Sequence, residues 1–304
     1  MILIIRGGDR FVDAASDIAA LSGIPPFLIG ATVVSFATTL PEILVSVTAA
    51  FNGQADMAAG NAIGSVTSNT AMILALSVIF LPGAVDRSRV LPKSVLLIAA
   101  ILVLWLSGLC GYLTPVGSLG LLLLFGVFVA ENITSAKHDI SSDGEESAVH
   151  TASLPKNIIF FLLGAGEIIL GSRLLVDNGT LIATDVLHIS ERIVSLTMVA
   201  IGTSLPELVT AISAIIKRKG SLTVGNILGA NIIDTLLILP LCSLTQGGVL
   251  PLSRSTVLID LPFCLLSVIV LLIPALIRGR FSRLQGIFSL LLYLIYTALL
   301  FVIG

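Results

Sequence analysis

The chain consists of long apolar stretches separated by short polar breaks. A helix of about 20 apolar residues crosses the core of a bilayer, and stretches of that length recur along the whole sequence. The predicted spans cover residues 1–20, 24–50, 57–81, 92–110, 114–132, 155–177, 190–216, 221–243, 257–277 and 283–303. The pattern therefore predicts an all-α polytopic membrane protein with ten transmembrane helices.

Composition supports this class and excludes others. Of the 304 residues, 56% are hydrophobic and only 11% are charged, whereas a soluble domain carries about 25% charged residues. A soluble globular enzyme and a disordered chain are both excluded on this ground. The net charge of −2 offers no basic stripe to neutralise phosphates, so no nucleic-acid partner is expected.

The distribution of Lys and Arg predicts the orientation. Ten spans place both termini on one side of the membrane, and cytoplasmic loops carry the excess of positive charge. With the N-terminus outside, the inner loops hold eleven Lys and Arg residues and the outer loops hold two, Arg192 and Arg254. We therefore expect a multi-pass protein of the cell membrane with both termini outside.

An internal repeat divides the chain. Shifted by 165 residues without a gap, residues 30–74 align with 195–239, with identity at 13 of 45 positions, helix-breaking and polar residues among them. The predicted units are a first five-helix repeat (1–132), a cytoplasmic acidic loop (133–154) and a second five-helix repeat (155–304). Because each half holds an odd number of spans, the second repeat enters the membrane inverted, which is the architecture of many secondary transporters.

Two carboxylates occupy equivalent positions inside apolar spans. Glu42 and Glu207 align in the repeat, and a bare carboxylate at the bilayer centre costs at least about 2.5 kcal/mol. Pro41 and Pro206 precede them and interrupt the helix, which leaves backbone carbonyls free to bind a cation. Thr38 lies one helical turn before Glu42, as Thr203 lies before Glu207, so each hydroxyl shares a face with its carboxylate.

Further oxygen groups surround this pair in the repeat. Asn69 aligns with Asp234, and Ser65 aligns with Ala230. A set of oxygen ligands without Cys or His selects hard cations, Ca²⁺ or Na⁺. The predicted function is therefore secondary active antiport by alternating access at a midplane site of paired glutamates. Catalysis and a bound cofactor are not expected, because an aspartyl dyad needs two Asp and Asn69 stands opposite Asp234.

The duplicated motif resembles that of the cation/Ca²⁺ exchanger superfamily, in particular its microbial Na⁺/Ca²⁺ exchangers. The family motif is G-T-S-L-P-E followed by G-N-x-x-G-S-N, and this chain has ATTLPE with GNAIGSVTSN and GTSLPE with GNILGANIID. The resemblance implies a ten-helix fold in which the first and sixth helices slide past the others. It also implies transport of Ca²⁺ and Na⁺ by a monomer whose only partners are these small cations and the lipid bilayer.

The same resemblance implies roles for individual residues. Glu42 and Glu207 are similar to the shared Ca²⁺ ligands, assisted by backbone oxygens of Thr38 and Thr203. The hydroxyls and carbonyls expected at the Na⁺ sites come from Thr39, Ser204, Ser35, Ala200 and Ser65. Asn69 and Asp234 are expected to line the middle position.

The chain departs from the family pattern in three places. Ala37 and Thr39 replace the glycine and serine of the first motif, and Ala230 replaces a serine near one Na⁺ site. The third departure is the first helix. The segment that begins at Gly7 resembles the one that begins at Gly171, but only six residues precede it, so we expect either that the true start codon lies upstream or that the first helix is truncated.

Alternative functions are a H⁺/Ca²⁺ exchanger or a K⁺-dependent Na⁺/Ca²⁺ exchanger of the same superfamily, and a passive cation channel. The proton-coupled branch has a glutamate after each G-N motif, and this chain has none there. The closed, asymmetric set of ligands argues against a channel. Glu167 and Asp260 have no acidic counterpart in the repeat, so we expect them to be structural carboxylates with protein partners.

Overall fold

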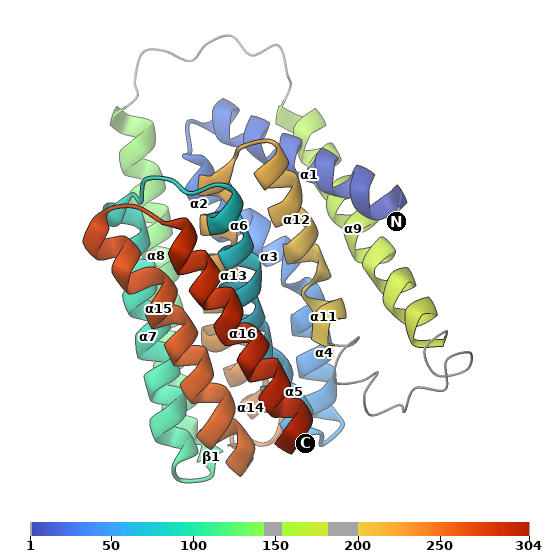
Figure 1. The fold of residues 1–304 in the computed structure, drawn as a ribbon, viewed down its shortest axis with the longest axis vertical. Helices are drawn as coiled ribbons and strands as arrows, with labels where there is room; N and C mark the ends of the chain where they lie inside the picture. The colour runs from blue at the N-terminus through green and yellow to red at the C-terminus, as the bar shows by residue number, and fades with distance from the viewer. Residues whose placement is uncertain (1, 143–153, 182–199, 304) are drawn as a thin grey trace.

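The computed structural model describes residues 2–142, 154–181 and 200–303, and they form a bundle of helices (Figure 1). The first half of the chain contains α1 (Ile2–Ser22), α2 (Pro26–Ile29), π-helix η1 (Gly30–Val34), α3 (Ser35–Thr38), α4 (Leu40–Phe51), α5 (Ala55–Ser68), π-helix η2 (Asn69–Leu74), α6 (Ala75–Phe80), α7 (Arg87–Gly108), β1 (Tyr112–Leu113) and α8 (Pro115–Ser142). In this half, helix α8 continues ten residues beyond the predicted end of its span at residue 132.

The second half repeats the same kinds of element. It contains α9 (Leu154–Leu181), α11 (Ala200–Thr203), α12 (Leu205–Ile216), α13 (Gly220–Ile233), π-helix η5 (Asp234–Ile238), α14 (Leu239–Thr245), β2 (Leu250–Pro251), π-helix η6 (Thr256–Asp260), α15 (Leu261–Arg278) and α16 (Arg283–Ile303). The strands β1 and β2 form a short antiparallel pair that joins the two halves at the lower end of the bundle in Figure 1.

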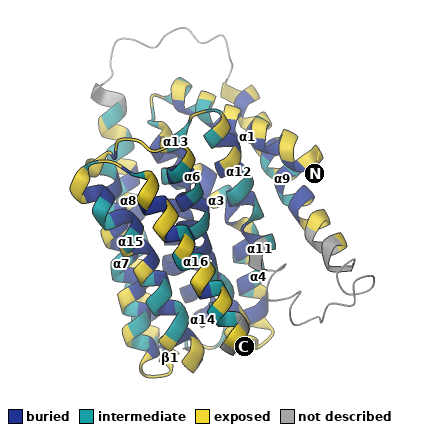
Figure 2. Cartoon of the chain, in the orientation of Figure 1, coloured by how far each residue is buried: buried dark blue, intermediate teal, exposed yellow. Residues whose placement is uncertain are grey.

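Two long segments form the centre of the bundle. Gly220–Thr245 is 83% buried and Ala55–Phe80 is 72% buried over their most apolar stretches, whereas the corresponding stretches of α8 and α16 are 22% buried. Figure 2 shows the same gradient, with buried residues on α13 and many exposed residues on α16. Residues 55–74 and 220–239, which align with each other in the sequence repeat, lie in these two central segments.

Seven helices in the described part of the chain are long and apolar enough to cross a membrane, or eight if the bent pair Pro26–Thr38 and Leu40–Phe51 is one span. The chain is thus a multi-pass helical membrane protein. Helix α1 does not qualify, because Arg6, Asp9, Arg10, Asp13 and Asp17 interrupt its apolar residues. Predicted span 190–216 lies partly outside the described residues, and its described helix α12 is only 12 residues long. The count of ten spans remains a prediction.

Helices α1 and α9 pack against each other at very short range. A Cβ atom at Gly7 would lie 2.8 Å from Cβ of Glu167, and one at Gly164 would lie 2.8 Å from the backbone nitrogen of Phe11. Absence of side chains at these positions lets the two backbones approach. The rings of Phe11 and Phe161 stack with centroids 4.4 Å apart, so α1 and α9 form a tightly packed helix pair.

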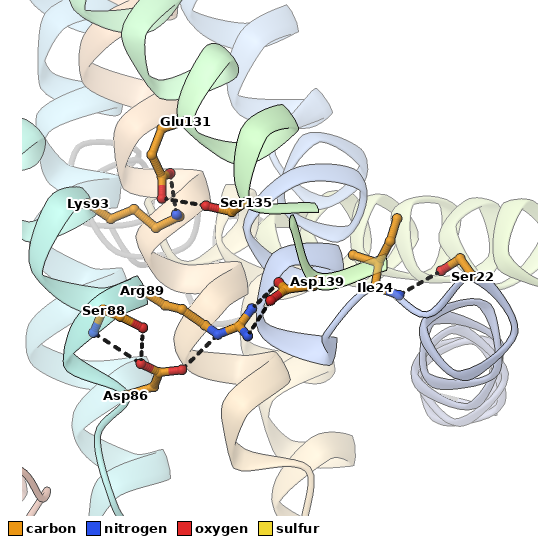
Figure 3. Close-up of polar contacts among 9 residues, drawn as sticks. All are labelled: Ser22, Ile24, Asp86, Ser88, Arg89, Lys93, Glu131, Ser135 and Asp139. Carbon is orange, nitrogen blue, oxygen red and sulfur yellow. Dashed lines mark hydrogen bonds and ion pairs between the residues drawn. The ribbon is translucent and has the colours of Figure 1, made fainter. Parts of the chain in front are cut away.

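Charged side chains are paired at the upper end of the bundle, where connections 81–86, 217–219 and 279–282 lie (Figure 3). Arg89 donates to Asp86 at 2.7 Å and to Asp139 at 2.9 Å, so the polar extension of α8 is held against α7. Lys93 is fully buried, 2.6 Å from Glu131, and its ammonium lies 5.4 Å from the ring centroid of Phe27. We call these five charged residues the upper-end network.

Candidate functional site

The two proline-containing motifs break their helices at equivalent residues. Helix α3 ends at Thr38 and α4 begins at Leu40, with a bend of 47° between them, while α11 ends at Thr203 and α12 begins at Leu205. Pro41 and Pro206 each occupy the second position of the new helix, where a proline without an N–H is tolerated. The breaks therefore fall at Thr39 and Ser204, and the glutamates lie in the first turns of α4 and α12.

Three acidic side chains, Glu42 and Glu207 at these breaks and Asp234 in the central segment, are buried without a cationic partner in the part of the chain that the structure describes. Glu42 is 1% exposed, and Glu207 and Asp234 are 0% exposed. Among the described residues, both carboxylate oxygens of Glu42, both of Asp234 and one of Glu207 accept no hydrogen bond. The carboxyl groups are close enough for their charges to interact, so ionising all three at once is unfavourable unless a cation lies among them.

Hydroxyl and amide groups connect the two halves around this cluster. Thr39 Oγ1 donates to Glu207 Oε1 at 3.4 Å. Thr38 Oγ1 donates to Asn226 Oδ1 at 3.3 Å, and Thr203 Oγ1 donates to Asn61 Oδ1 at 3.3 Å. In the 165-residue repeat Thr38 aligns with Thr203 and Asn61 aligns with Asn226. The Thr38–Asn226 and Thr203–Asn61 contacts are therefore equivalent in the two copies. The contacts are therefore reciprocal, as they are at a twofold axis.

Asn69 and Asp234 begin the two π-helices in the central segments. Helix α5 ends at Ser68 and η2 starts at Asn69, while α13 ends at Ile233 and η5 starts at Asp234. A π-helical turn is rare and is found frequently at functional sites. Asn69 is 1% exposed and its Oδ1 atom has no partner among the described residues. The structure thus brings Asn69 and Asp234 to equivalent buried positions.

The other predicted ligands, Ser35, Ser204, Ser65 and Ala200, have different surroundings in the structure. Ser35 is buried and its carbonyl accepts the Thr38 hydroxyl at 3.3 Å. Ser204 Oγ lies 3.3 Å from Ser68 Oγ, and Ser65 is 3% exposed on the same helix as Ser68. Ala200 begins α11, and nothing is described of its side chain. Ala230, which stands where Ser65 stands in the first copy, is fully buried.

Sequence reasoning missed three polar residues at the site. Asn61 and Asn226 belong to the repeated G-N motif, but the sequence analysis did not include them among the candidate ligands. Their identity in both copies was the available signal. Ser68 has no serine in the second copy, since Ile233 aligns with it, so the repeat gave no indication of its contact with Ser204.

Glycines on η1 and α13 lie where these two helices touch. A Cβ atom at Gly229 would lie 2.5 Å from Ser35 Oγ, and one at Gly30 would lie 2.9 Å from the Asn226 backbone nitrogen. These contacts bring η1 and α13 together beside the site. No described atom lies within 4 Å of such a Cβ at Gly60 or Gly64. Segment 190–199, which the repeat would place there, is not among the described residues.

The arrangement brings together oxygen groups of several kinds. Nowhere in residues 2–142, 154–181 and 200–303 do three or more His, Cys, Asp or Glu side chains gather in a way that could hold a metal ion. The available groups are carboxylates, amide oxygens, hydroxyls and backbone carbonyls. Such mixed oxygen sets suit Ca²⁺ and Na⁺.

The carboxylates without acidic counterparts in the repeat have protein partners, as predicted. Arg10 Nη1 lies 2.6 Å from Glu167 Oε1 and joins α1 to α9. The hydroxyl of Tyr296 donates to Asp260 at 2.9 Å and joins α16 to η6. These two side chains therefore differ from Glu42 and Asp234, which have no such partner among the described residues.

Comparison with known proteins places the chain first among membrane transporters and then in one family. The sequence profile described as "Sodium/calcium exchanger protein" matches residues 1–133 and 156–302. The chain belongs to this sodium/calcium exchanger family, which transports Na⁺ and Ca²⁺. The family identity agrees with the resemblance seen in the duplicated motif.

Individual relatives cover most of the chain. It is 38% identical to the inner membrane protein YrbG of Escherichia coli over 84% of the chain and 81% of that protein. It is 32% identical to the putative antiporter CaxA of Alkalimonas amylolytica over 99% and 96%. A structure of the sodium-calcium exchanger NCX_Mj soaked with Na⁺ and Sr²⁺ superposes with a TM-score of 0.82 at 30% identity, covering 98% of this chain and 95% of that one.

Proposed function

We propose that this chain exchanges Na⁺ for Ca²⁺ across the membrane by alternating access at a site formed by Glu42 and Glu207. The observation that carries the proposal is the burial of two repeat-equivalent carboxylates: both oxygens of Glu42 and one oxygen of Glu207 accept no hydrogen bond from the described residues. A divalent cation between them supplies the missing positive charge, and two carboxylates neutralise one Ca²⁺. Family membership and the similarity to NCX_Mj support Na⁺ as the counter-ion.

We assign the remaining ligands around this pair. The hydroxyls of Thr39 and Ser204 lie at the two helix breaks, and Asn69 and Asp234 lie at the starts of η2 and η5. Carbonyls of Thr38, Thr203, Ser35 and Ala200 and the side chain of Ser65 complete the proposed set. Na⁺ carries a single charge, so hydroxyl and carbonyl oxygens at these positions coordinate Na⁺ ions when Ca²⁺ is absent.

Alternating access follows from an inverted repeat. The reciprocal contacts Thr38–Asn226 and Thr203–Asn61 support a twofold relation between the halves. Two halves with opposite orientation can exchange conformations and thereby open the same site to either side. The excess of Lys and Arg at the upper end favours a cytoplasmic location for that end, with both termini outside.

The test is flux into proteoliposomes that contain the purified full chain. We expect uptake of ⁴⁵Ca²⁺ when Na⁺ is loaded inside the vesicles, and no uptake driven by a pH gradient alone. Glu42→Gln and Glu207→Gln abolish uptake, while Glu167→Gln, which removes a paired carboxylate, serves as the matched control. Uptake that depends only on protons would reject the Na⁺ assignment, and uptake that needs no counter-ion gradient would indicate a channel.

A further inference from the structure

A groove of about 730 Å³ runs between α15 and α16 near the upper end of the bundle. Most of its lining is apolar, from residues Val270, Pro274, Phe288, Leu291, Leu292 and Ile295. Phe288 is 63% exposed and Ile295 is 59% exposed, so this lining belongs to the outer surface of the bundle. In a membrane such a surface faces hydrocarbon chains.

Polar groups occur only at one end of the groove. Arg278, Ser282 and Gln285 line that end. The candidate spans end at Arg278 and begin again at Arg283, which places these groups where the hydrocarbon core meets the headgroups. The groove therefore has the polarity of a phospholipid: its apolar length lies in the membrane and its polar end lies at the interface.

The polar end is rigidly built. The Ser282 amide donates to Gln285 Oε1 at 2.9 Å and the Gln285 amide donates to Ser282 Oγ at 3.4 Å, which is a capping box at the start of α16. The Phe281 amide donates to the Gly83 carbonyl at 2.8 Å, and Arg87 donates to the Ile277 carbonyl at 2.5 Å. These contacts fix connection 279–282 to connection 81–86.

This end carries positive charge that the described protein does not neutralise. Arg278, Arg280 and Arg283 are exposed, and no ion pair involves them among the described residues. Residues 261–304 contain no Asp or Glu. The carboxylate of Asp86, on the facing connection, already accepts from Ser88 and Arg89.

We propose that this groove binds a phospholipid with an anionic headgroup. One acyl chain lies along the apolar lining, and the phosphate is held by the guanidinium groups of Arg278, Arg280 and Arg283. Guanidinium binds phosphate oxygens in bidentate geometry and is only weakly hydrated, so it suits a headgroup at the interface. The inference uses none of the transport-site residues and stands whether or not the proposed exchange is correct.

The first test measures thermal unfolding of the full chain in detergent micelles. We expect phosphatidylglycerol to raise the Tm by roughly 2–4 °C more than phosphatidylcholine of the same acyl length. In a triple variant, Arg278→Gln with Arg280→Gln and Arg283→Gln, the two lipids should have equal effects. A matched triple variant, Arg6→Gln with Lys156→Gln and Arg254→Gln, loses the same charge elsewhere and should keep the preference.

A second variant tests the groove itself. Leu291→Trp fills the apolar lining and should reduce the response to phosphatidylglycerol, whereas Leu294→Trp, on the exposed surface of α16 but outside the groove, should not. Equal responses of the unaltered chain to both lipids would overturn the proposal, as would a preference retained in the triple arginine variant. Light scattering that shows a dimer broken by Leu291→Trp would also overturn it and assign the groove to a second copy.

Discussion

Buried charged groups have ion-pair partners in the upper-end network, whereas the central carboxylates have none in the described part of the chain. Lys93 is as completely buried as Glu207, but its ammonium lies 2.6 Å from Glu131, and Arg89 is held between Asp86 and Asp139. At the centre, Glu42 and Asp234 have no cationic partner among the described residues. An ion pair within the protein joins two helices, whereas a buried carboxylate without such a partner is available to a cation from solution. We therefore distinguish paired structural charge from the unpaired charge that we propose for transport.

The largest expected effect comes from neutralising a central carboxylate. We expect Glu42→Gln or Glu207→Gln to weaken Ca²⁺ binding by about 100-fold or more, because each removes a charged group that we propose as a direct Ca²⁺ ligand. Ca²⁺ should stabilise the unaltered chain by mass action and should not stabilise either variant. Thermal unfolding with and without Ca²⁺ measures this.

The same measurement in cation-free buffer sharpens the comparison. Each glutamine variant should then unfold at a temperature equal to or above that of the unaltered chain, since it removes an uncompensated buried charge. The control, Glu167→Gln, should keep the Ca²⁺ response because Glu167 is paired with Arg10. Loss of stability in cation-free buffer would mean that groups of the protein compensate the charge of the central carboxylates.

In the upper-end network we expect the opposite result: neutralising one charge lowers the free energy of unfolding, and neutralising both charges restores most of it. Lys93→Met leaves Glu131 without its cation, and because Glu131 is partly exposed we expect a loss of about 1–3 kcal/mol in the free energy of unfolding. The double variant, Lys93→Met with Glu131→Gln, removes both charges and should recover most of that loss. Its Na⁺-driven Ca²⁺ flux per folded molecule should match that of the unaltered chain.

Denaturant unfolding of the single and double variants tests the pairing. Equal destabilisation in both would show that Lys93 acts through packing against Phe27 and Phe128 rather than through its ion pair. Loss of flux in the stable double variant would show that the network takes part in transport. Either result would remove the distinction between structural and transport charge.

A smaller effect is expected from the amides that join the halves. Asn61→Leu and Asn226→Leu each remove the acceptor of a threonine hydroxyl that lies beside the carboxylates. We expect each to raise the apparent Kd for Ca²⁺ by roughly tenfold, as is typical of groups that support metal ligands. Equilibrium ⁴⁵Ca²⁺ binding measures it.

The repeat provides a control for this effect. Since the two contacts are equivalent, the two variants should have similar effects, and Asn178→Ala on the exposed surface of α9 should have none. A large effect of only one variant would contradict the twofold relation at the site. Unchanged binding in both would remove the amides from the supporting shell.

Repetition in the sequence explains how much of the site was predictable. The helix breaks at Thr39 and Ser204 follow from Pro41 and Pro206, and burial of Glu42 and Glu207 follows from their apolar surroundings. These are local consequences of residue type. Family membership and the helical membrane fold were also predicted correctly from the duplicated motif.

Features that depend on tertiary contact were not predictable in the same way. Lys93 lies at the start of the predicted span 92–110, where a lysine is expected to reach the membrane surface, but the structure buries it because Glu131 on α8 supplies its counter-charge. Residues 133–142 were assigned to a loop, but α8 continues through them, and Arg89 on α7 pairs with Asp139 in this extension. Neither pair is repeated in the sequence, so only the packing of α7 against α8 reveals them.

The smallest expected effect concerns the edge of the network and its pH dependence. Burial opposes ionisation of Asp86, but hydrogen bonds from Ser88 and Arg89 outweigh it, so the pKa of Asp86 lies below its ordinary value. A lowered folded-state pKa adds stability above the unfolded value of about 3.9, and this stability is lost as the pH falls through the folded pKa. Asp86→Asn should therefore flatten the acid side of the Tm–pH curve slightly, since half-exposed pairs contribute little. Asp56→Asn, on the exposed first turn of α5, is the matched control, and an equal flattening in both variants would show that Asp86 is not specifically stabilised by its partners.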